Sequence, residues 1–192
     1  NLFSKLTASS RICICAIGMS VVEVLKYNNH KLKQLEIIIP SNYNYFGKII
    51  NEWQSILDNI KSVYSVDTRN FADVIYNILK VPEFQDKVDL LVFDNNVHTK
   101  NSRYLPFANI PQFFTSILFM MKKLNKQGTF ILHFLEASYK PIADLYLLCS
   151  SLFEESHLFY PDVANPYKFT GTIGVFINYK GFDTNIYEKM YA

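Results

Sequence analysis

Residues 88–94, with the sequence VDLLVFD, decide the fold of this chain. The stretch is apolar at nearly every position and stops at an acidic residue, Asp94. An almost continuous apolar run of this length is typical of a strand whose two faces are both buried in a parallel sheet. We therefore predict a central parallel strand here, with Asp94 at its carboxyl end.

Strand-like and helix-like segments alternate on both sides of this strand. Further short apolar runs predict strands at 12–17, 34–40, 62–66, 129–135, 157–160 and 172–179. Helices are predicted where the chain is helix-like or apolar residues recur at helical spacing, in 21–27, 49–60, 71–79, 110–124 and 141–153. Five βα units followed by a β–β pair indicate an α/β fold, a mostly parallel sheet with helices on both faces. In such sheets the functional residues lie beyond the carboxyl ends of the strands.

The composition fits one globular domain. Of the 192 residues, 49% are hydrophobic and 19% are charged, which excludes a disordered protein. We expect residues 1–192 to form a single domain, and the start at Asn1 predicts that it is a fragment of a longer chain. The net charge of +2 neither requires nor excludes a nucleic-acid partner.

The cysteines indicate the compartment. Three cysteines make neither a disulfide framework nor a zinc site, so we expect an intracellular, reducing environment. Cys13 and Cys15 alternate with isoleucines and are expected to be buried packing residues. We expect no membrane association, because no apolar stretch approaches about 18 residues and no signal peptide pattern is present.

Several enzyme classes are excluded by motifs that the chain lacks. It has no G-x-G-x-x-G turn of a nicotinamide-binding domain and no G-x-x-x-x-G-K-[ST] phosphate loop. It also has no G-x-S-x-G nucleophile elbow and no zinc-binding His/Cys spacing.

Three successive segments of the chain resemble a known family. They are VDLLVFDNN at 88–96, the predicted helix at 110–124, and LNKQGTFILHFLE at 124–136. Their order and spacing resemble the FtsJ-type (RrmJ-like) methyltransferases, which methylate the ribose 2′-hydroxyl of ribosomal RNA or mRNA caps with S-adenosylmethionine. The resemblance implies a Rossmann-like methyltransferase fold, whose seven-stranded sheet is mostly parallel and has an antiparallel last strand.

The family orients the ribose hydroxyl with a Lys-Asp-Lys-Glu set. The resemblance places its Asp at Asp94 and its first Lys at Lys5. The second Lys position is His133, and the Glu position falls near Gly171 and Thr172, where no acid is present. An imidazole is mostly neutral at pH 7, so it is a poor replacement for a permanent ammonium.

The cofactor side also departs from the family pattern. The family's glycine-rich turn after the first strand is CAIGMS here, with Gly18 alone, and side chains at the other positions would crowd S-adenosylmethionine. The acid expected after the second strand is missing from 40–42. The resemblance gives Asp67, after the third strand, a contact with adenine.

Each candidate site residue also has a plain structural interpretation. Asp94 could cap the loop after its strand, and Asp67 could cap the next helix. Lys5 could be a solvent-exposed lysine near the N-terminus. His133 could be a histidine at the end of the sheet with satisfied hydrogen bonds, and Gly18 could simply form a strand-to-helix turn.

Three hypotheses about function follow. The first is a degenerate FtsJ-like domain that binds or scaffolds within an RNA-processing protein or complex, with RNA and another protein chain or neighbouring domain as partners. The second is an active RNA 2′-O-ribose methyltransferase with a divergent site, in which Asp94, His133 and Lys5 position the ribose and S-adenosylmethionine is the cofactor. The third is an unrelated α/β protein, since fold alone does not give function.

Overall fold

The computed structural model describes residues 10–15, 34–40, 60–66, 86–94, 105–135, 138–160 and 171–191. The strands in these ranges are β1 (Arg11–Cys15), β2 (Gln34–Pro40), β3 (Ile60–Val66), β4 (Val88–Asp94), β5 (Leu124–Leu135), β6 (Phe153–Phe159) and β7 (Gly171–Tyr179). The helices are α4 (Leu105–Lys123), α5 (Lys140–Ser151) and α6 (Thr184–Tyr191).

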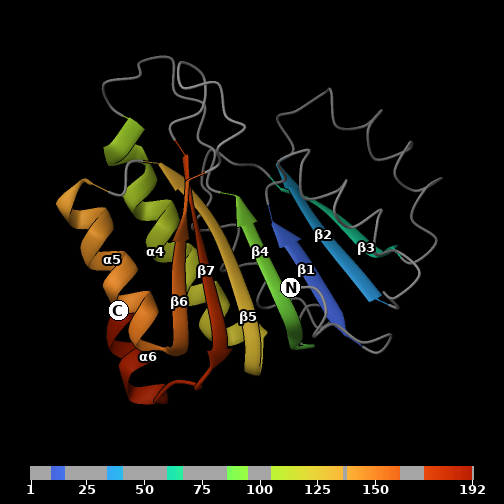
Figure 1. The fold of residues 1–192 in the computed structure, drawn as a ribbon. Helices are drawn as coiled ribbons and strands as arrows, with labels where there is room; N and C mark the ends of the chain where they lie inside the picture. Colours follow the sequence, from blue (N-terminus) through green and yellow to red (C-terminus); the bar gives the residue numbers. More distant parts are fainter. Residues whose placement is uncertain are drawn as a thin grey trace.

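The seven strands form one sheet in the order β3-β2-β1-β4-β5-β7-β6 (Figure 1). Neighbours from β3 to β5 pair in parallel, and β7 runs antiparallel to both β5 and β6. The mostly parallel sheet with an antiparallel last strand is therefore the arrangement predicted from the sequence.

Helices α4, α5 and α6 gather on one face of the sheet, beside β5, β7 and β6 (Figure 1). The segments predicted as helices at 21–27, 49–59 and 71–79 lie outside the described residues. Ile60, predicted as the last residue of the second of these helices, is instead the first residue of β3.

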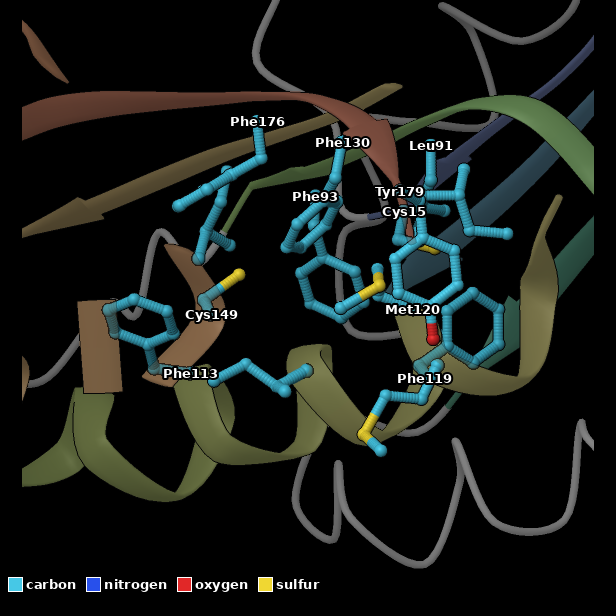
Figure 2. Close-up of a cluster of buried hydrophobic side chains, with 14 of the residues drawn as sticks. Cys15, Leu91, Phe93, Phe113, Phe119, Met120, Phe130, Cys149, Phe176 and Tyr179 are labelled. Atoms are coloured by element: carbon cyan, nitrogen blue, oxygen red, sulfur yellow. The ribbon is translucent and has the colours of Figure 1, made fainter. Parts of the chain in front are cut away.

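An aromatic layer fills the space between the sheet and these helices. Figure 2 shows strand side chains meeting helix side chains in one cluster, among them Phe93, Phe113, Phe119, Phe130 and Phe176. The ring centroids of Phe130 and Phe176, from β5 and β7, are 5.7 Å apart, and those of Phe113 and Phe134 are 4.9 Å apart. Burying one phenylalanine stabilises the fold by about 1.5–3 kcal/mol, so this layer is a large part of the driving force for folding.

A polar network joins β1, β4 and β5 at their amino ends. The Arg11 backbone N–H donates to one carboxylate oxygen of Asp89 (2.9 Å), and the Asn125 side-chain amide donates to the other (2.8 Å). The Arg11 guanidinium pairs with Asp86 at 3.0 Å. Asp89, the one charge inside the apolar run of β4, therefore joins β1, β4 and β5 at their amino ends.

Helix α4 and strand β5 both begin earlier than predicted. Helix α4 starts at Leu105 rather than 110, and it tolerates Pro111, whose carbonyl accepts a hydrogen bond from the Thr115 hydroxyl (2.7 Å). Strand β5 starts at Leu124 rather than 129 and contains Gln127 with a φ of 64°. A left-handed residue is typical of a bulge, so what looked like a turn in the sequence is an irregular part of the strand.

The last two differences lie near the C-terminus. Strand β6 begins at Phe153 rather than 157, and helix α6 was not predicted at all. The Asp183 carboxylate caps α6 by accepting the Asn185 N–H (2.8 Å), and the Lys122 ammonium of α4 lies 4.1 Å from the Tyr187 ring centroid. Contact with α4 thus supports a helix of only eight residues, too short to be stable by itself.

All three cysteines are buried and unbridged, which confirms the packing role predicted for Cys13 and Cys15. Burial raises the pKa of the Cys149 thiol well above its usual value. No helix in the described ranges is long and apolar enough to cross a bilayer.

Tyr179, the last residue of β7, carries a buried hydroxyl at the edge of the aromatic layer. Its side chain is 2% exposed, and no hydrogen-bond partner for the hydroxyl lies among the described residues. Burial, and secondarily the charge of an ionised Cys149, raises the pKa of Tyr179 above its usual value.

The substitution Tyr179→Phe should raise the free energy of unfolding at neutral pH by about 1 kcal/mol, because it removes a buried hydroxyl that has no partner among the described residues and keeps the ring. Since the folded-state pKa is raised, the stability of the wild type is complete below the unfolded pKa of about 10 and is lost as the pH rises above it. The advantage of the phenylalanine variant should therefore grow above about pH 10. Urea denaturation of both proteins over this pH range measures the difference, and a less stable variant at neutral pH would contradict the prediction.

Candidate functional site

The candidate site lies at the edge where the parallel strands end. The last residues of β1 to β5 are Cys15, Pro40, Val66, Asp94 and Leu135, and parallel strands bring their carboxyl ends to one edge. The chain builds the sheet outward in one direction through β2 and β3 and in the other through β4 and β5. Ligands of such sheets bind in the crevice where the direction reverses, which here lies between β1 and β4.

Asp94 and His133 are neighbours at this edge. They are paired in register on β4 and β5, whose backbones lie about 4.8 Å apart as in any sheet. On its other side, His133 is paired with Ile173 of β7. Two residues that the sequence analysis placed in the site are thus side by side, although 39 positions apart in the chain (133 − 94).

The His133 ring turns toward β7 rather than β4. Leu132 and Phe134 belong to the aromatic layer, so the alternation of the strand directs His133 to the opposite face of the sheet. A Cβ added at Gly171, the first residue of β7, would overlap His133 Nε2. Because β7 and β4 flank β5 on opposite sides, the buried Nε2 end of the imidazole lies on the side away from the strand that carries Asp94.

Gly171 is what makes this ring position available. Any other residue there would place its Cβ where the imidazole lies. Thr172 offers no alternative position for an acid, because it is buried and paired with Phe134 on the helix-covered face. The acid that the resemblance places near Gly171 and Thr172 is therefore absent, and the space beside Gly171 is filled by His133.

Three predicted site residues, Lys5, Gly18 and Asp67, lie outside the described residues. In sequence, Gly18 comes three positions after Cys15, the end of β1, and Asp67 directly follows Val66, the end of β3. Of the glycines in the described part of the chain, Gly171 is the one at the carboxyl edge, and its space is taken. No group of three metal-ligating side chains occurs within the described ranges.

The sequence analysis missed the role of Gly171 as the seat of the His133 ring. The available signal was a glycine directly before the strand predicted at 172–179, which the resemblance implied to run antiparallel. The diagonal contact between the two residues depends on the register of β5 and β7, which the sequence alone does not give.

No protein-family model matches the chain, and no curated protein does either. Solved structures do match over nearly the whole chain. A protein described as a ribosomal RNA methyltransferase from Plasmodium falciparum is 18% identical, with 94% of this chain and 92% of that chain covered and a TM-score of 0.60. A methyltransferase from Streptococcus mutans in complex with SAH is 16% identical, with 93% of each chain covered and a TM-score of 0.55. An rRNA methylase from Streptococcus thermophilus is 9% identical, with 93% of each chain covered and a TM-score of 0.55.

These likenesses concern the fold. The chain has the Rossmann-like fold of S-adenosylmethionine-dependent methyltransferases, which confirms the predicted fold class. At such low identities the likeness carries no residue roles, so the chemistry of the site depends on Asp94, His133 and Gly171 themselves.

The contact between His133 and Gly171 predicts a specific energetic coupling. Gly171→Ala should lower the free energy of unfolding by about 2 kcal/mol in the wild type, because the new methyl group overlaps the imidazole. In a His133→Ala background the same change should cost less than about 0.5 kcal/mol, since the space is then empty. Chemical denaturation of the four proteins of this cycle measures the coupling.

Gly174→Ala is the matched control. An added Cβ there would meet Phe176 and Phe134 in the aromatic layer, so its cost should be the same with or without the imidazole. Equal costs of Gly171→Ala in both backgrounds would contradict the position assigned to the His133 ring.

Proposed function

We propose that this chain is a methyltransferase-fold domain of FtsJ-like descent that has lost catalysis and binds or scaffolds within an RNA-processing protein or complex. The observation that carries the proposal is the His133 imidazole seated against Gly171, where the resemblance places an acid. That arrangement leaves the ribose-orienting set without its acid and with an imidazole in place of a lysine.

The missing charges have a large expected effect on rate. An RNA 2′-hydroxyl attacks the methyl sulfonium only when the surrounding charges orient it and ease the loss of its proton. Removing one preorganised group from such a site costs about 10²–10³ in rate. Two replaced groups, with the Nε2 end of His133 lying away from the strand of Asp94, support a negligible turnover.

S-adenosylmethionine is the cofactor that this fold implies, and when bound it supplies the transferable methyl group. We place its site in the crevice between β1 and β4, with Gly18 giving the backbone approach and Asp67 contacting the adenine. The sequence CAIGMS has other residues where the family has further glycines, so the proposal includes weak or absent cofactor binding.

One observation favours the alternative, an active S-adenosylmethionine-dependent RNA 2′-O-ribose methyltransferase. Asp94 and His133 are adjacent at the carboxyl edge, where a ribose hydroxyl would have to lie. In that case Asp94 orients the hydroxyl and His133 and Lys5 share the remaining roles. The substrate in this alternative is a ribosomal RNA or an mRNA cap.

Partners and compartment belong to the same proposal. RNA is the nucleic-acid partner, and another protein chain or a neighbouring domain supplies the second contact surface. The three buried, unbridged cysteines support an intracellular, reducing compartment.

Calorimetric titration with S-adenosylmethionine separates the two functions. We expect no binding heat at millimolar ligand, because the turn after β1 is poor in glycine. An active ribosomal RNA methyltransferase of this fold is the positive control. Binding at micromolar concentration would overturn the degenerate proposal and restore the enzyme.

If the chain is active, Asp94→Ala should reduce methyl transfer to capped or ribosomal RNA by about 10²–10³. The control is Asp144→Ala, which removes an exposed carboxylate whose partner is Lys140 on α5. Filter-binding assays with labelled methyl donor measure the rate, and circular dichroism checks that both variants fold. Equal activity of the two variants would remove Asp94 from the site.

A further inference from the structure

Strand β6 is an edge strand with an unusual surface. Among the described strands it pairs with β7 alone, so its outer backbone groups have no strand beside them. Three consecutive residues at its end are exposed, Leu158 at 40%, Phe159 at 52% and Tyr160 at 67%. An open edge that ends in exposed apolar side chains is typical of a site that pairs with another strand.

We propose that this edge is where two copies of the chain associate, by antiparallel pairing of β6 with β6 of the second copy. Such pairing continues the sheet across a twofold axis, and a twofold interface uses the same patch on both copies. Backbone hydrogen bonds form along the joined edges, and the apolar residues at the end of each strand are covered.

The charges on β6 select one register for this pairing. Glu154, Glu155 and His157 are all exposed, and the His157 Nε2 atom lies 3.6 Å from a Glu155 carboxylate oxygen in the same strand. If the twofold axis passes through Ser156, Glu155 of each copy falls opposite His157 of the other. Two carboxylate–imidazole pairs then face each other across the interface, and an imidazole N–H can donate a hydrogen bond to the carboxylate in each pair.

Neighbouring registers lack this match. An axis through Glu155 would set the two Glu155 carboxylates against each other, and like charges directly opposite destabilise a strand pair. An axis through His157 would set Glu155 opposite Phe159 and leave both imidazoles without a facing carboxylate. The glutamates therefore disfavour the neighbouring registers and specify one partner register. The register centred on Ser156 also spans the whole strand, with Phe153 opposite Phe159 of the second copy.

Charge exchange tests the proposal directly. We expect the wild type to form a dimer in sedimentation equilibrium between low micromolar and several hundred micromolar protein. His157→Glu should weaken it by about tenfold or more, because glutamates then face each other twice. Glu155→Lys should weaken it as well, because a lysine then faces an imidazole.

Mixing the two variants should restore association. The new lysine of one chain then faces the new glutamate of the other, and the remaining glutamate faces the remaining histidine. Circular dichroism and thermal melting establish that each variant is folded. A wild type that stays monomeric, variants that dimerise like the wild type, or a mixture that associates no better than its components would each overturn the proposal.

The apolar contribution has a matched pair of variants. Phe159→Gln should weaken the dimer, because Phe159 lies on the proposed interface. Ile186→Gln changes a similarly exposed apolar residue, 50% exposed on α6, and should leave the dimer unchanged. Equal effects of the two substitutions would overturn the assignment of the interface to β6.

Discussion

The aromatic layer between the sheet and helices α4 and α5 is the contact on which the rest of the described structure depends. Phe130 and Phe176 stack across β5 and β7, and Phe113 and Phe134 join α4 to β5. The contact between Phe130 and Phe176 fixes the register of antiparallel β7 against β5. Because side chains alternate along a strand, the same packing that directs Leu132 and Phe134 inward directs His133 to the other face.

The site is a consequence of that arrangement. Strand β5 is flanked by β4 and β7, so His133 has Asp94 on one side and the opening of β7 on the other. The ring lies over Gly171, where no side chain competes for the space. The ring therefore approaches β7 and not the strand that carries Asp94. The position of the imidazole and the glycine that opens β7 thus depend on each other.

Strong periodicity made much of the fold predictable. The apolar run at 88–94 and the alternation around it predicted the strand type and the approximate strand positions, and the family resemblance implied the antiparallel last strand. Asp94 could be placed at the functional edge because a buried strand ends there. Helix α6 was not predicted because it has only eight residues, and a helix this short depends on contacts such as that of Lys122 with Tyr187. The contact between His133 and Gly171 was not predicted, because it depends on the register of two strands that are far apart in sequence.

Strand β1 has neighbours that appear at very different times during synthesis. It ends at Cys15, one partner follows at β2, and the other, β4, ends at Asp94. Until residue 94 has left the ribosome, one edge of β1 lacks its native partner, because Ile12 to Cys15 pair with Leu90 to Phe93 of β4. Long-range pairing of this kind slows folding and exposes an unpaired strand edge while the chain is being synthesised.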